Sequence, residues 1–351
     1  MNIPINILLS WYKHENYQMP WRKDNNPYQI WISEIMLQQT QVQTVKKYYI
    51  KWMQKYPTVQ SVAEANIDSI LKIWEGLGYY QRAHNIRKAA QAIVTKHQGK
   101  IPQTYEQLIK LQGIGDYTAS AILSIAFKKK YPAIDGNLKR VISRFYALSE
   151  SSQNMLVFKD KVQHLMNNNN AGKINQAFMD LGREICTYKA PQCHLCPIAN
   201  QCVAYSNNKV ENFPKMTLKK PKPSYDVVVG MIYKKNKFLI SKRKNKGLLK
   251  GLWELPGGKK NAKENNKECL KREIKEELDI EIDITKKIGI VNHQYSHFKI
   301  NLIGYHCIYK SGEPKPLASD SIRWISKKNI NSFAFPKSTL KFFNLTEEDI
   351  L

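Results

Sequence analysis

Four cysteines gathered in one short segment are the feature that most constrains this chain. They span 17 residues with the spacing C-x6-C-x2-C-x5-C and are Cys186, Cys193, Cys196 and Cys202. Disulfide frameworks are typical of short secreted chains, whereas this chain has 351 residues and begins MNIPINILLSWYKHENY, without the pattern of a secretory signal. The cluster therefore predicts a metal centre. The remaining Cys269 and Cys307 are expected to be buried small side chains.

The net charge limits the classes of molecule that this chain is expected to bind. Lys and Arg number 55 against 29 Asp and Glu, which gives a net charge of +26. Such a field favours polyanions, so nucleic acid and an anionic membrane surface both fit. A lysine-rich composition without functional meaning fits as well. The lack of an apolar run of 18 residues argues against a membrane span, and the length predicts about two domains.

Apolar periodicity divides the chain into two parts. Residues 1 to about 205 are predicted to be mostly helical from stripes at 3.6-residue spacing: Val42, Val45, Tyr48, Tyr49 and Trp52; Ala83, Ile86, Ala90, Ile93 and Val94; Ile174, Ala177, Phe178, Leu181 and Ile185. Residues 209–223, KVENFPKMTLKKPKP, are typical of an extended charged linker. Beyond it we expect an α+β domain, with a hairpin turning at 234–237, a helix over 264–278 and strands within 288–310.

A glycine hairpin is the second strong motif. In LQGIGDYTASAILSIAF, residues 111–127, Gly113 and Gly115 precede an apolar helix. Glycines there permit positive φ and let backbone N–H groups approach a phosphate. Such a contact binds the DNA backbone without reading the base sequence. A plain turn between two helices is the alternative.

The hairpin, the segment AIDGNLKRV at 133–141 and the four cysteines together resemble the endonuclease-III-like superfamily of base-excision DNA glycosylases. The block MPWR…NPYQIWISEIMLQQTQV, residues 19–42, narrows this resemblance to the MutY-type adenine DNA glycosylases. The resemblance covers nearly the whole chain. It implies an all-α helix-hairpin-helix glycosylase domain at 1–208 with an iron–sulfur loop at 186–202, a linker at 209–223, and an α+β Nudix-like domain at 224–351.

Two carboxyl groups carry the chemistry that the resemblance implies. Glu34 lies among Ile30, Trp31 and Ile35, whose burial of the carboxyl would raise its pKa toward that of a general acid. The matching glutamate of the family protonates the flipped adenine, and the aspartate matching Asp135 stabilises the cationic sugar. A salt-bridged helix residue and a helix N-cap are their structural alternatives. Asn137 matches a site-positioning residue.

Tyr117 bears on the type of reaction. Relatives that also cleave the DNA backbone carry a lysine at this point, which forms a Schiff base with the sugar. Tyrosine cannot do this, so the resemblance predicts a monofunctional glycosylase that uses water. Because Lys128, Lys129 and Lys130 lie nearby in sequence, weak lyase activity stays an alternative.

Other matches concern DNA. Gln39 and Tyr79 match the family's wedge and stacking positions, which hold the duplex once a base is flipped out. Thr40 follows in the same LQQT segment, and Trp21 and Arg22 match the entrance of the adenine pocket. A core tyrosine is the alternative for Tyr79.

The resemblance also suggests the metal. Four thiolates suit a [4Fe–4S] cluster, which the cysteine spacing favours, whereas tetrahedral Zn²⁺ is the rival. The cluster is expected to hold a basic loop against phosphates rather than take part in hydrolysis.

The second domain resembles a lesion reader. GLLKGLWELPGGKK is similar to the Nudix-like domain with which MutY-type enzymes recognise 8-oxoguanine opposite adenine, and Tyr295, Ser296 and His297 match its lesion-reading loop. A strand-edge loop is the alternative. A near-complete Nudix box is also present, in which Glu273, Glu276 and Glu277 share one helix face and would bind Mg²⁺. Its final glycine is replaced by Asp279.

We therefore expect a cytoplasmic, monomeric enzyme, associated with the nucleoid through DNA. It would hydrolyse the N-glycosidic bond of adenine mispaired with 8-oxoguanine or guanine. The alternatives are a Mg²⁺-dependent nucleotide pyrophosphohydrolase activity of the Nudix-like domain, a bifunctional glycosylase–lyase, and a non-catalytic iron–sulfur DNA-binding protein.

Overall fold

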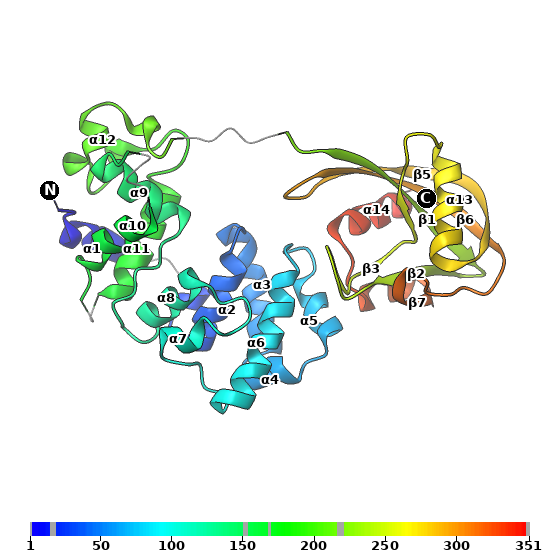
Figure 1. Ribbon diagram of the computed structural model, residues 1–351, viewed down its shortest axis with the longest axis horizontal. Coiled ribbons are helices and arrows are strands. Elements are labelled where there is room, and N and C mark those ends of the chain that lie inside the picture. Colours follow the sequence, from blue (N-terminus) through cyan, green and yellow to red (C-terminus); the bar gives the residue numbers. More distant parts are fainter. Residues whose placement is uncertain (1, 15–18, 150–153, 168–169, 216–220, 349–351) are drawn as a thin grey trace. The chain divides into compact units, whose positions relative to one another are not determined.

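The computed structural model describes the chain except for residues 1, 15–18, 150–153, 168–169, 216–220 and 349–351 (Figure 1). Contacts divide the chain into two compact units, one formed by residues 1–64 and 85–218 and the other by 65–84 and 219–351. This division differs from the predicted one, which assigns 65–84 to the first domain. Part of the predicted linker, 216–220, lies outside the described residues.

The first unit is helical. Its α-helices are α1 (Ile5–His14), α2 (Pro27–Leu37), α3 (Val42–Lys55), α4 (Val59–Glu64), most of α6 (Gln81–His97), α7 (Tyr105–Leu108), α8 (Asp116–Ile125), α9 (Gly136–Tyr146), α10 (Met155–Gln163), α11 (Ala171–Glu184) and α12 (Val203–Ser206). Short 3-10 helices cover Pro20–Arg22, Cys193–Leu195, Ala199–Gln201 and Val210–Asn212. The three periodic stripes lie on α3, α6 and α11, as predicted.

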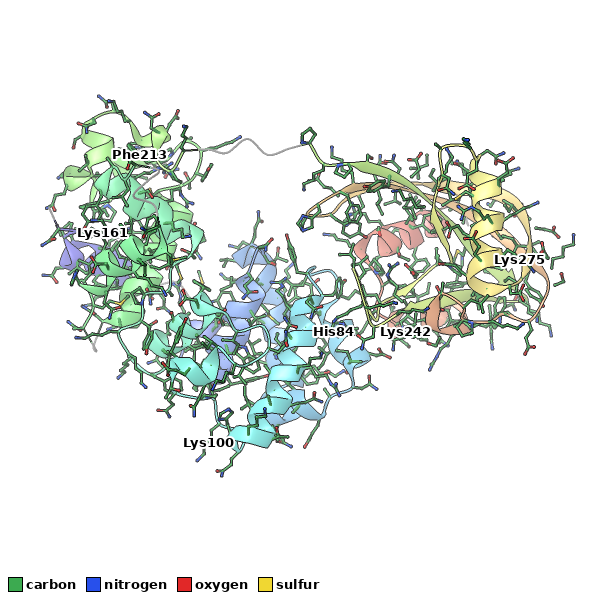
Figure 2. All side chains as sticks on the ribbon, in the orientation of Figure 1. His84, Lys100, Lys161, Phe213, Lys242 and Lys275 are labelled. Atoms are coloured by element: carbon green, nitrogen blue, oxygen red, sulfur yellow. The ribbon has the colours of Figure 1, made fainter. Side chains whose placement is uncertain are left out.

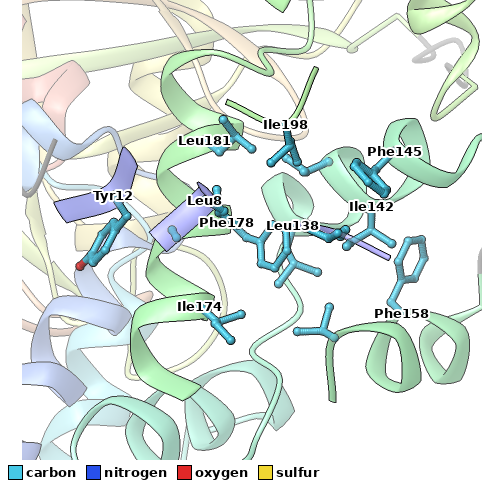
Figure 3. Packing of buried hydrophobic residues seen from close by; sticks show 14 of the residues in the cluster. Leu8, Tyr12, Leu138, Ile142, Phe145, Phe158, Ile174, Phe178, Leu181 and Ile198 are labelled. Carbon is cyan, nitrogen blue, oxygen red and sulfur yellow. The ribbon is translucent and has the colours of Figure 1, made fainter. Parts of the chain in front are cut away.

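One apolar core joins α1, α9, α10 and α11. Leu8, Leu138, Ile142 and Phe178 are fully buried in it, and Figure 3 shows their side chains directed toward one another. The cysteine loop packs on this core through Ile198 and through the partly buried Cys186, Cys196 and Cys202. Burial of apolar area is the main stabilising term, so the core fixes the end of α11 and the loop that follows it.

The second unit combines α5 (Ile67–Trp74) with a mixed sheet. Its strands are β1 (Ser224–Lys234), β2 (Lys237–Arg243), β3 (Trp253–Glu254), β4 (Gly257–Lys259), β5 (Glu281–Gln294), β6 (Lys299–Ser311) and β7 (Ser319–Ile325), and its other helices are α13 (Asn266–Leu278), the 3-10 helix Lys327–Ser332 and α14 (Lys337–Glu348). The main strand order is β3-β2-β1-β6-β5, with β4 on β1 and β7 on β2. Strands β1 and β6 are parallel, whereas the other pairs are antiparallel.

Alternation along β1 places a core on each face of the sheet. Val228 packs with Leu270 of α13 on one face, and Val229 packs with Phe342 of α14 on the other. Successive side chains of a strand point to opposite faces, so one strand serves both layers. Gly304 allows α14 to approach closely, since a Cβ there would lie 1.8 Å from the Phe342 ring.

The predicted fold class, a helical glycosylase-type domain followed by an α+β Nudix-like domain, is confirmed. The predicted hairpin turn at 234–237 is tighter, because Lys234 and Lys237 already pair and leave residues 235 and 236 to turn. Within the described residues, no helix has the length and apolar character needed to cross a membrane.

Candidate active site

A cavity of about 1180 Å³ in the first unit gathers most of the predicted catalytic and DNA-binding residues. Its walls include Glu34 from α2, Tyr117 from α8 and Asp180 from α11. Among the predicted residues that also line it are Trp21, Arg22, Gln39, Thr40, Gly115, Asp135 and Asn137. Residues as far apart in sequence as Arg22 and Asp180, 158 positions, thus contribute to one pocket.

Glu34 is a buried carboxyl on α2, with 6% of the residue exposed. The Tyr117 hydroxyl donates a hydrogen bond to its Oε2 at 2.7 Å. Burial raises the pKa of Glu34 to about 7, against the opposing effects of the Tyr117 bond and the Arg22 charge. A carboxyl with such a pKa holds and releases a proton near neutral pH.

Asp135 is the N-cap of α9. Its Oδ1 accepts the backbone N–H of Leu138 at 2.7 Å, and its Oδ2 accepts the side-chain amide of Asn137 at 2.9 Å. Burial raises the pKa of Asp135, whereas these hydrogen bonds act in the opposite direction. Asp135 therefore caps α9, as the structural alternative predicts, and the same geometry holds its carboxylate at the wall of the cavity.

Arg140, one turn further along α9, connects Asp135 to the cysteine loop. Its guanidinium donates to Asn137 Oδ1 at 2.8 Å, to the Gly182 carbonyl at 2.6 Å and to the Cys186 carbonyl at 2.7 Å. Gly182 is needed for this approach, because a Cβ there would lie 2.6 Å from the Asn137 side chain. A continuous chain of hydrogen bonds thus runs from Asp135 through Asn137 and Arg140 to Cys186.

Arg22 is held by Asp180 of α11, a residue that the sequence motifs do not single out. Asp180 accepts two hydrogen bonds from the Arg22 guanidinium, at 2.6 and 3.0 Å, and a third contact from Arg183 at 3.1 Å. Burial lowers the pKa of Arg22, but the hydrogen bond and charge of Asp180, with the charges of Tyr12 and Glu34, together outweigh this effect, and the pKa is raised. In the sequence, Asp180 is recognisable only as a charged residue between Phe178 and Leu181 of the apolar stripe on α11.

Trp21, next to Arg22, lines the same cavity. It is 4% exposed and packs edge-on against Tyr49, with 5.3 Å between ring centroids. The contact with Tyr49 therefore fixes one side of the Trp21 ring.

The glycine hairpin has the expected backbone. Gly113 has a φ of +81°, and a Cβ there would lie 2.7 Å from Asn85, so only glycine fits. Gly115 is the N-cap of α8. A Cβ added there would have no atom within 4 Å, so the space around it is open. Gln39 is exposed with a φ of 56°, and Thr40 follows it.

The four predicted thiols, those of Cys186, Cys193, Cys196 and Cys202, line one small apolar cavity. Arg144 donates to the Cys186 sulfur at 3.3 Å. In the described part of the chain, no three His, Cys, Asp or Glu side chains are arranged to hold a single metal ion. Four cysteine thiolates suit a [4Fe–4S] cluster and also tetrahedral Zn²⁺, so the donor set around this cavity fits the predicted metal centre.

The predicted lesion contacts lie in the second unit, as does Tyr79. Tyr295, Ser296 and His297 form the turn between β5 and β6, which is closed by the bond from the Tyr295 N–H to the Phe298 carbonyl. The Ser296 hydroxyl donates to the Tyr79 hydroxyl at 2.7 Å. Tyr79 is 41% exposed with a φ of 49°, so it is not the core tyrosine of the alternative.

The carboxylates of the predicted Mg²⁺ site on α13 are paired with an arginine. Arg272 binds Glu264, Glu273 and Glu276 at 2.7 to 3.1 Å. Glu277 is turned away to accept the Gly257 N–H, and burial raises its pKa to about 7. Asp279 adopts the left-handed conformation that the missing glycine would have, and it pairs with Lys275.

Comparisons with known proteins agree with this geometry. Residues 32–164 match the family described as HhH-GPD superfamily base excision DNA repair protein, and 227–345 match the NUDIX domain. An adenine DNA glycosylase of Buchnera aphidicola subsp. Schizaphis graminum is 35% identical over 97% of both chains. One from Homo sapiens is 30% identical over 96% of this chain and 73% of its own. The structure of a thermostable thymine-DNA glycosylase is 27% identical, with a TM-score of 0.54, and covers 58% of this chain and 95% of that one.

Proposed function

Since the chain belongs to the adenine DNA glycosylases of base excision repair, we propose that Glu34 is the acid and Asp135 the cation-stabilising carboxylate of its reaction. One observation carries this proposal. The two carboxyls line one cavity but have different surroundings: Glu34 has a pKa near 7, and Asp135 accepts two hydrogen bonds. Such a division suits an acid and an anion that act on one bond.

The reaction follows from these states. Protonated Glu34 gives its proton to a ring nitrogen of adenine, so that the bond between the base and the sugar carbon breaks with both electrons leaving on the base. The sugar is left with positive charge, which the Asp135 carboxylate stabilises. Water then adds to the sugar carbon and loses a proton to the Glu34 carboxylate, which restores the acid. Asn137 and Arg140 hold Asp135 in place, and Arg22 with Asp180 forms a fixed polar wall for the base.

We propose that the enzyme is monofunctional. Tyr117, at the position where a lyase carries its lysine, has its hydroxyl engaged by Glu34 and offers no amine to the sugar. Its role is to orient the acid and to set the pKa of Glu34.

The substrate that we propose is adenine opposite 8-oxoguanine or guanine. The hydrogen bond between Ser296 and Tyr79 supports this, because it brings the predicted lesion-reading turn and the predicted stacking ring together. Tyr295 and His293 pack edge-on beside this turn, with 4.7 Å between centroids. Gln39 would fill the gap left by the flipped base.

We propose a [4Fe–4S] cluster on Cys186, Cys193, Cys196 and Cys202, which would supply cross-links that hold the loop together. The hydrogen bonds from Arg144 to the Cys186 sulfur and from Arg140 to its carbonyl tie this loop to α9. We further propose that the protein is a cytoplasmic monomer and that it acts on chromosomal DNA, as its match to a base excision DNA repair family suggests. A pyrophosphohydrolase activity is not favoured, because Arg272 holds the carboxylates that Mg²⁺ would need.

Single-turnover assays on matched duplexes test this proposal. Adenine should be released from duplexes with adenine opposite 8-oxoguanine or guanine, and much more slowly from duplexes with adenine opposite thymine. The strand should break only after alkali or heat. Equal release from all three duplexes would refute the proposed substrate, and breakage without alkali would refute a monofunctional enzyme.

A further inference from the structure

A second cavity, of about 950 Å³, lies beside the catalytic one in the first unit. We call it the lysine groove, defined by Lys128, Lys129, Lys130, Lys159 and the rings of Tyr105 and Tyr131. Asp116, the first residue of α8, lines both cavities and directly follows the glycine hairpin. The groove therefore adjoins the hairpin and the catalytic pocket.

The groove is cationic, and its one acidic side chain is neutralised. Oδ1 of Asp116 accepts the Lys159 ammonium at 2.9 Å and the Tyr105 hydroxyl at 2.8 Å. Lys128 and Lys130 are both exposed. Neither forms an ion pair with any residue that the structure describes. Two charges are thus left facing solvent without an internal counterion.

The walls of the groove are held firmly. The Tyr105 and Tyr131 rings stack with 5.8 Å between centroids and 7° between planes. The Gln163 amide binds the Lys130 carbonyl at 2.8 Å. Fully buried Asn175 binds the Tyr131 carbonyl at 2.9 Å and the Ala133 N–H at 3.0 Å. The segment that leads to Asp135 is therefore anchored from the groove onward.

We propose that the lysine groove binds the DNA backbone as a phosphate site separate from the glycine hairpin. This rests on the proposed function only in so far as the ligand is duplex DNA. Because Asp116 follows the hairpin and lines the groove, a strand that is held by the hairpin N–H groups and runs along the groove would meet Lys128 and Lys130. Ammonium groups bind phosphates as point charges, so this contact would add affinity without sequence preference. The anchored segment would also place the strand relative to Asp135.

The test is the salt dependence of binding to a duplex with adenine opposite 8-oxoguanine. The double variant Lys128→Gln/Lys130→Gln changes two exposed side chains, and its matched control is Lys88→Gln/Lys96→Gln, two exposed lysines of α6. Each lost phosphate contact lowers the slope of log K against log salt by about 0.9. We expect the groove variant to lose about 1 to 2 in slope, and the control to stay within about 0.3 of wild type.

Duplexes shortened from one side or the other of the adenine then locate the contact. The difference between wild type and the groove variant should vanish in one of the two series only. Equal slopes for the groove and control variants would overturn the proposal, as would a difference that persists in both series. Adenine release by wild type at saturating enzyme is independent of this outcome, so its absence would instead refute the proposed function.

Discussion

Glu34 is subject to opposing influences on its pKa. Burial raises it to about 7, whereas the hydrogen bond from Tyr117 and the charge of Arg22 favour the carboxylate. Burial also raises the pKa of Asp135, but its hydrogen bonds with Leu138 and Asn137 favour the charged form. The rate should therefore be bell-shaped in pH. It falls at low pH as Asp135 gains a proton, and at high pH as Glu34 loses its own.

Replacing Tyr117 with phenylalanine should move only one limb of that profile. Without the phenolic donor the charged form of Glu34 loses a stabilising bond, so its pKa rises and the high-pH limb moves upward by roughly one pH unit. The measurement is the single-turnover rate of adenine release between pH 5 and 10. The low-pH limb is the internal control, and a high-pH limb that stays in place or moves downward would contradict the assignment.

At the scale of single residues, sequence motifs were sufficient to nominate Glu34 and Asp135 together with Tyr117 and Asn137, which contact them. The motifs did not reveal the pairing of Arg22 with Asp180 or the contacts of Arg140. Arg22 and Asp180 are 158 positions apart, and nothing in either local pattern specifies that they meet. Arg140 belongs to α9, whose apolar side carries Leu138, Val141 and Ile142, and its bond to the Gly182 carbonyl depends on how α9 and α11 pack.

At the scale of elements, α14 depends on one glycine in the sheet. A Cβ on Gly304 would lie 1.8 Å from the buried Phe342 ring, so Gly304→Ala should push the helix away from β6. Overpacking of this kind costs about 1–3 kcal/mol. Urea unfolding of the full chain should show the loss as a lower midpoint.

The control for this substitution is the Phe342→Leu background. If the ring causes the clash, Gly304→Ala should cost clearly less when the smaller side chain is present. The same cost in both backgrounds would place the strain elsewhere in the strand.

Elements were predicted well where the period was clear, as in α3, α6 and α11. The sequence did not disclose that α5, with residues 65–84, contacts the C-terminal part of the chain. These contacts use isolated polar groups. Glu75 accepts the Phe335 N–H at 2.8 Å, and Asp68 binds Lys242 at 2.7 Å. No local pattern marks such pairs, whereas apolar stripes repeat and can be recognised.

For the whole molecule, the charge of +26 agrees with DNA as the partner of an adenine DNA glycosylase. Lysine side chains extend from many surfaces, Lys100, Lys161 and Lys275 among them (Figure 2). They differ in partners, because Lys161 lies 4.0 Å from the centre of the Tyr146 ring and Lys275 pairs with Asp279. Unpaired lysines near the hairpin are therefore more informative about DNA than the total charge, which a lysine-rich composition also produces.

The central claim is that Glu34 supplies the proton that releases adenine, and it is tested most directly by one comparison. Single-turnover release from a duplex with adenine opposite 8-oxoguanine should be measured for wild type and for Glu34→Gln, with both proteins shown to bind the duplex equally. General acid catalysis contributes about 10²–10⁴-fold, so the account predicts a loss of at least about a hundredfold at pH 7. Release by Glu34→Gln within about twofold of wild type would contradict it.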